Sequence, residues 1–101
     1  MSNPSEATIE RYLVAQCKAR GWRALKLVDI GRAGHPDRTV MCNGGYVWLC
    51  EVKKLGGILS KLQALRVEQF RRMGFAVFVV WSKEDVDEAI CDMAAKIIPQ
   101  C

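Results

Sequence analysis

Apolar side chains recur every three to four residues near the start, in the middle and near the end of the chain, which is the spacing of helices. The first helix is predicted to begin at Pro4, with Asn3 as its cap, and to end near Arg20, before Gly21. Its apolar stripe consists of Ile9, Leu13, Val14 and Cys17.

Between the first two helices the pattern changes to that of extended chain. Residues 22–30 are the first predicted strand, and a turn-rich loop follows at 31–36. A short strand at 38–42, a hairpin signal in the sequence Asn-Gly-Gly at 43–45 and a returning strand at 46–53 come next. Because both faces of the returning strand are mostly apolar, we expect it at the centre of a sheet.

The second half of the chain predicts a helix, a strand and a final helix. The second helix is expected at 60–74, where Gln63 completes a capping box with Ser60. Residues 76–81 are all apolar, so they predict a strand that is buried on both faces and parallel to a neighbour. The last helix is expected at 82–96, with a serine as its cap.

The order α-β-β-β-α-β-α predicts a small α/β fold with a mixed central sheet flanked by helices, in which the crossover to the parallel strand is right-handed. With 101 residues, the chain is expected to form one domain, 1–101. No apolar run approaches the roughly 18 residues of a membrane helix. The N-terminus lacks the pattern of a signal peptide, so a cytoplasmic protein is expected.

Charge and cysteine content narrow the range of possible partners and metal sites only slightly. The formal net charge of +4 is compatible with a polyanionic partner but does not establish one. The five cysteines include no C-x-x-C pair and the chain has one histidine, which argues against structural zinc. Buried, reduced thiols are the favoured interpretation of these cysteines.

The candidate chemistry lies in Asp37, Glu51 and Lys53. Glu51 and Lys53 are two residues apart on a predicted strand, so they share a face and lie roughly 6.5–7 Å apart along the chain. A hairpin would bring Asp37 back beside them. Two carboxylates and a lysine form a minimal site for a divalent cation and an activated water, as in nucleases. The alternative is a Glu51–Lys53 ion pair next to an ordinary turn aspartate.

Glu10 is aligned with the apolar stripe of the first helix. An acid on a buried face needs a partner or a metal ion, so one hypothesis places it near the metal site. The other places it at the rim, paired with a basic residue such as Arg11. The pattern alone favours neither.

These motifs together resemble the PD-(D/E)xK nuclease superfamily, and within it the stand-alone VRR-NUC domains. The resemblance extends from Glu10 to about Ile90. The matching features are the helical Glu10, Gly34-His35-Pro36-Asp37-Arg38, Glu51-Val52-Lys53, Leu59-Ser60-Lys61-Leu62-Gln63, Met73-Gly74-Phe75 and Ser82. A restriction-endonuclease-like core is the fold that this resemblance implies.

The resemblance also implies a role for each site residue. Asp37, Glu51 and the Val52 carbonyl would bind Mg²⁺ or Mn²⁺, and Lys53 would hold the attacking water or help to deprotonate it. Glu10 would assist the metal site, directly or through water.

Further residues are expected beside this centre. Gln63 would orient the lysine or the water. The candidate contacts to nucleic acid are Arg32, His35, Arg38, Lys54 and Lys61.

The function implied is a metal-dependent DNA endonuclease that selects branched DNA, such as a Holliday junction, and acts as a homodimer. Small size supports dimerisation, because DNA-binding modules usually bury roughly 600 Å² or more and two copies offer a wider surface. The alternative is a non-catalytic nucleic-acid-binding or assembly module on the same fold. A sequence-specific restriction-type enzyme is less favoured, because no added recognition segment is present.

Overall fold

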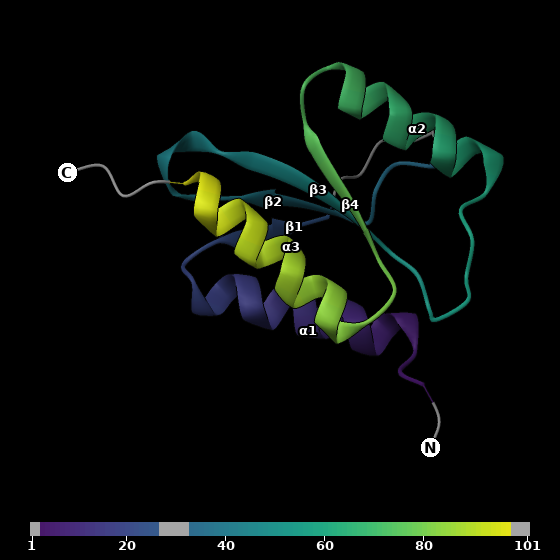
Figure 1. The fold of residues 1–101 in the computed structure, drawn as a ribbon, viewed down its shortest axis with the longest axis horizontal. Coiled ribbons are helices and arrows are strands. Elements are labelled where there is room, and N and C mark those ends of the chain that lie inside the picture. Colours follow the sequence, from purple (N-terminus) through teal and green to yellow (C-terminus); the bar gives the residue numbers. More distant parts are fainter. Residues whose placement is uncertain (1–2, 27–32, 98–101) are drawn as a thin grey trace.

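The computed structural model describes residues 3–26 and 33–97 and contains three helices and four strands within them. Figure 1 shows two helices side by side on one face of the sheet and the third on the other face. In chain order the elements are α1 (Glu6–Ala19), β1 (Arg23–Leu25), β2 (Arg38–Met41), β3 (Val47–Val52), α2 (Lys61–Arg72), β4 (Ala76–Val80) and α3 (Lys83–Lys96). A short 3-10 turn, Asn43–Gly45, joins β2 to β3. The expected order α-β-β-β-α-β-α is confirmed.

The sheet is mixed, with the strand order β1-β2-β3-β4. β1, β2 and β3 are antiparallel neighbours, and β4 runs parallel to β3. The central position of β3 is therefore confirmed. β4 is the last strand of the described sheet. Val77 is buried against α2 and Val80 is buried on the opposite face, against α1 and α3, so the expectation of a strand that is buried on both faces and parallel to a neighbour is confirmed. An unbroken apolar run does not distinguish a central strand from an edge strand.

The start of α1 differs from the expectation. Ser5, rather than Asn3, is the cap, and its hydroxyl accepts a hydrogen bond from the Thr8 amide at 3.2 Å. Both residue types cap helices, so composition alone did not separate them. The expected first strand at 22–30 is also much shorter, since β1 is three residues long and residues 27–32 lie outside the described part.

Alternating side chains of β3 divide the apolar interior into two unequal parts. Trp48, Cys50 and Val52 belong to the larger core, which α1 and α3 cover. Leu49 belongs to the smaller core, where it packs with Val67 of α2 and Val77 of β4. The predicted assignment of faces is thus confirmed, and Glu51 falls on the same face as Leu49.

The larger core contains free thiols. Cys17, Cys42 and Cys50 are buried and unbonded, as expected, whereas Cys91 is exposed. Burial raises the pKa of Cys17 to about 12, so this thiol stays protonated at neutral pH. Within the described residues, no helix combines the length and the apolar character that crossing a membrane requires.

Candidate active site

The hairpin places Asp37 beside the end of β3. Arg38 of β2 pairs with Cys50 of β3, so Asp37, one residue earlier, lies next to Glu51 and Val52. The Asp37 carboxylate accepts a hydrogen bond of 2.7 Å from the Val52 amide. This bond holds a residue of an irregular loop against a central strand.

Glu51 is the one charged residue among the buried side chains of the described chain, and it is only 2 % exposed. Burial, followed by a hydrogen bond to the Asp37 carboxyl group and the charge of Asp37, raises the pKa of Glu51 to about 8. The charge of Lys53 acts in the opposite direction. Glu51 therefore retains its proton to a higher pH than a solvated glutamate, because ionising a buried carboxyl group beside Asp37 is unfavourable without a cation.

Lys53 follows directly after β3, and its amide donates to the Val80 carbonyl at 2.9 Å. The backbone at this position is thereby bound to β4, and the side chain, half-buried, stands two residues from Glu51 on the same face. The three expected residues, Asp37, Glu51 and Lys53, are thus brought together.

The donor set fits a small divalent cation. Mg²⁺ is usually held by one or two carboxylates and completes its shell with water and substrate phosphate oxygens. Asp37 and Glu51 offer two carboxyl groups, and a cation can replace the proton that Glu51 retains. No group of three or more His, Cys, Asp and Glu side chains arranged for a metal occurs within residues 3–26 and 33–97. The protein would therefore supply only part of the coordination shell.

Glu10 is engaged with basic residues. Its carboxylate accepts a hydrogen bond of 2.7 Å from Arg38 Nε and lies 3.9 Å from Lys26 Nζ. Arg38 also donates to the Ala24 carbonyl at 3.1 Å. The rim pairing considered as one hypothesis therefore exists, with Arg38 and Lys26 as partners in place of Arg11. The pair connects α1 to β2 at the residue next to Asp37.

Glu6 is a site residue that sequence reasoning missed. Its charge is among the causes that raise the pKa of Glu51, so it lies within electrostatic reach of the carboxyl pair. Glu6 and Glu10 are four residues apart on α1 and share a helix face. That spacing was the available signal, but the first turn of a helix commonly carries acids for other reasons.

Gln63 forms the expected capping box. Its side-chain oxygen accepts from the Ser60 amide at 2.9 Å, while its own backbone amide donates to the Ser60 hydroxyl at 3.1 Å. The side-chain oxygen of Gln63 is thus occupied in holding the start of α2. Its NH₂ group is the part that a role toward Lys53 or water would use.

The loop before Asp37 is packed against α2. Gly34 has φ +84, and a Cβ there would lie 2.7 Å from Leu62 Cγ and 3.1 Å from the Leu62 carbonyl oxygen. The ring of the next residue, His35, lies 5.8 Å from that of Phe70. The position of Asp37 therefore depends on a close contact that only glycine permits.

We expect Gly34→Ala to destabilise the protein by about 2 kcal/mol or more, since a left-handed conformation and a steric clash both oppose the methyl group. Urea unfolding at fixed pH measures this loss. Gly45→Ala is the matched control, because Gly45 has φ +80 but a methyl group added there would meet no atom within 4 Å. Equal losses in the two variants would contradict a packing role for Gly34.

The remaining basic residues are the other predicted contacts to nucleic acid. Lys54 and Lys61 are exposed on either side of the loop between β3 and α2. Arg32 lies outside the described residues. His35 is half-buried against Phe70.

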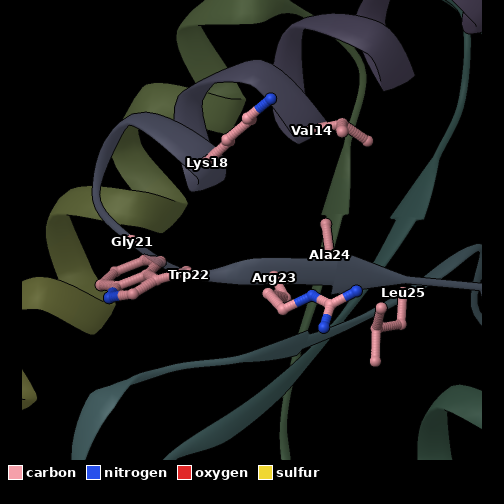
Figure 2. Close-up of a pocket in the computed structure, with 7 residues that line it drawn as sticks. All are labelled: Val14, Lys18, Gly21, Trp22, Arg23, Ala24 and Leu25. Carbon is pink, nitrogen blue, oxygen red and sulfur yellow. The ribbon is translucent and has the colours of Figure 1, made fainter.

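Two hollows lie along α1. Figure 2 shows one of about 490 Å³ between α1 and β1, where Val14, Lys18 and Ala24 are among the lining residues. The second, about 520 Å³, is lined by Glu10, Arg11 and other residues of α1 together with Arg38. Neither of these two hollows is lined by Asp37 or Glu51.

Comparison with known proteins identifies the fold. No family model matches the chain, and no curated protein matches it in sequence. Among solved structures, a chain titled "VRR_NUC domain" is similar with a TM-score of 0.80 and 32% sequence identity. The alignment covers 86% of this chain and 96% of that chain.

Proposed function

Because the chain belongs to the VRR-NUC family and has its nuclease-like fold, we propose that it is a divalent-metal-dependent endonuclease that hydrolyses phosphodiester bonds in DNA. The observation that carries this proposal is the buried Glu51 in hydrogen-bond contact with Asp37, with Lys53 beside them. A purely structural site gains nothing from a second carboxyl group placed beside a buried glutamate whose pKa is raised.

The roles of the residues follow from their chemistry. Asp37 and Glu51, with the Val52 carbonyl, would hold Mg²⁺ or Mn²⁺. A bound cation of this kind lowers the pKa of its water and neutralises charge on the scissile phosphate. Lys53 holds the attacking water and stabilises charge on a phosphate oxygen. The water oxygen bonds to phosphorus as the water gives up one proton to solvent, the bond to the leaving sugar oxygen breaks, and that oxygen takes up a proton from solvent.

The residues around this centre act by positioning. The hydrogen bond from the Val52 amide orients Asp37. Glu10 acts through Arg38, which it holds beside Asp37, and Gln63 orients Lys53 or the water through its NH₂ group.

The substrate proposed is branched DNA, including Holliday junctions, cut by a homodimer. One copy is small for duplex recognition, since DNA-binding modules bury roughly 600 Å² or more. Two copies related by a two-fold axis would present two active centres, one for each strand. Lys54 and Lys61 are exposed and suited to phosphate contacts. His35, two residues before Asp37, is a further candidate, as is Arg32, which lies outside the described residues.

Incubation with branched and linear DNA, in Mg²⁺, Mn²⁺ or EDTA, tests the proposal. We expect cleavage with either metal, none with EDTA, and faster cutting of the branched substrate. Light scattering on the same sample should give twice the monomer mass. Binding without cleavage under every metal condition would favour the non-catalytic module instead, and a monomer that cuts at full rate would exclude the dimer.

A further inference from the structure

The segment between β3 and α2, residues 53–60, presents an apolar side chain to solvent next to Gly57, which lies against Lys53: a Cβ at Gly57 would be 3.5 Å from Lys53 Cβ. Ile58 is 84 % exposed, more than any other large hydrophobic residue in the described chain. Exposing such a side chain is unfavourable by itself, because burying it would contribute roughly 1.5–3 kcal/mol. An exposed isoleucine at this place indicates a surface that is covered when a partner binds.

Exposure of Ile58 does not result from a loose loop. The Gly57 amide donates to the Lys54 carbonyl at 2.8 Å, which closes a turn. The Gly57 carbonyl accepts a hydrogen bond of 2.7 Å from the indole of Trp81. On the other side of Ile58, Leu59 packs against the smaller core. The isoleucine is therefore held between two fixed neighbours and projects from a defined backbone.

The charge around Ile58 indicates what kind of partner would cover it. Lys53 and Lys54 precede it, Lys61 follows it, and the chain has no acidic residue between Glu51 and Glu68. Phosphates are attracted to such a surface, whereas an apolar protein partner would have to desolvate these lysines. The surroundings favour nucleic acid.

Leu55, the other exposed apolar residue of this segment, is placed differently. It lines a hollow of about 310 Å³ together with Pro4 and Trp81, between the starts of α1 and α3. Leu55 thus borders a hollow of the protein surface and is less exposed than Ile58, at 58 %. Ile58 remains as the projecting side chain.

We propose that Ile58 is an apolar wedge that enters an unstacked base step at the branch point of DNA held by this protein. The proposal rests on the proposed nuclease function and adds to it a residue that determines substrate selectivity. Proteins that open DNA commonly insert isoleucine, leucine or methionine between base steps. Unstacking costs least where pairing is already interrupted, so a wedge would favour a branch over continuous duplex.

The experiment compares Ile58→Ala and Ile58→Phe with wild type on a splayed-arm DNA and on a fully paired duplex of the same sequence. Loss of a base-stacking contact should lower kcat/KM for the branched DNA about tenfold in Ile58→Ala, with the duplex rate unchanged. Ile58→Phe should restore or increase the branched rate. Met73→Ala is the matched control, since Met73 is 69 % exposed just beyond the other end of α2.

A binding measurement separates this proposal from the nuclease function. The Lys53→Ala protein, which should bind without cutting, is titrated into branched DNA with 2-aminopurine at the junction. A fluorescence rise that Ile58→Ala removes supports the wedge even if wild type cuts no DNA, a result that would refute only the nuclease. Equal effects on both substrates, no effect of Ile58→Ala, or conversion of a dimer to a monomer by Ile58→Ala would each overturn the wedge.

Discussion

Replacing Glu51 by glutamine is expected to lower the rate of DNA cleavage by about 10³-fold or more, because the site loses one of its two carboxylates. Glutamine has nearly the same shape and keeps one oxygen, but its amide is neutral. It therefore cannot replace a carboxyl group that loses its proton when a cation binds. Lys53→Ala should cause a loss of similar size by removing the group that holds the water. Initial cleavage rates in saturating Mg²⁺ and Mn²⁺ measure both effects.

Two further measurements make this result specific to the site. Glu88→Gln removes an exposed carboxylate of α3 and should leave the rate unchanged. DNA binding by Glu51→Gln should be equal to or tighter than that of wild type, since a negative charge near phosphate is lost. Cleavage that persists at the wild-type rate in Glu51→Gln or Lys53→Ala would refute the proposed mechanism.

The stability of the metal-free protein is expected to fall as the pH rises from about 4.5 to about 8. The pKa of Glu51 is raised from 4.5 to about 8 in the folded state, by burial first and by Asp37 second. In this window the folded state retains a proton that the unfolded state has released, so the unfolded state binds fewer protons and stability decreases with pH. The expected contribution is on the order of a few kcal/mol by pH 8.

Glu51→Gln should remove most of this dependence, because glutamine stays neutral at every pH. Urea unfolding in EDTA at several pH values, with Glu88→Gln as the control, compares the slopes. At pH 8 the Glu51→Gln protein should be more stable than wild type, and at pH 4.5 nearly equal to it. Added Mg²⁺ should stabilise wild type at pH 8 and not the variant, since a ligand stabilises the state that binds it. Parallel pH curves for the two proteins would show that Glu51 is not held protonated.

Local sequence signals predicted most of the elements. Apolar periodicity placed all three helices, and the alternation along β3 assigned its two faces, because side-chain direction repeats with a fixed period in both structures. The capping box at Ser60 and Gln63 was found at the predicted residues, since its chemistry involves only residues within one helical turn. The cap of α1 was wrong because Asn3 and Ser5 are both suitable residue types.

The position of β4 at the end of the described sheet and the partners of Glu10 could not be obtained in this way. An apolar run has the same pattern in a central and an edge strand, and the position of β4 depends on where α2 returns the chain. The pairing of Glu10 with Arg38 joins residues 28 positions apart. A repeat of two to four residues cannot predict a contact over such a separation in the sequence.

For the site, the sequence by itself determined which groups are available, namely Asp37, Glu51 and Lys53. It also placed Glu51 and Lys53 on one face, because side chains alternate along a strand. Only the tertiary structure decided how they meet. The hairpin register sets Asp37 against β3, the Val52 amide holds it there, and burial between the sheet and the helices leaves Glu51 almost without water. The raised pKa of Glu51 is a consequence of desolvation and of a neighbouring charge. Both depend on contacts across the fold, so they arise only when the chain is folded.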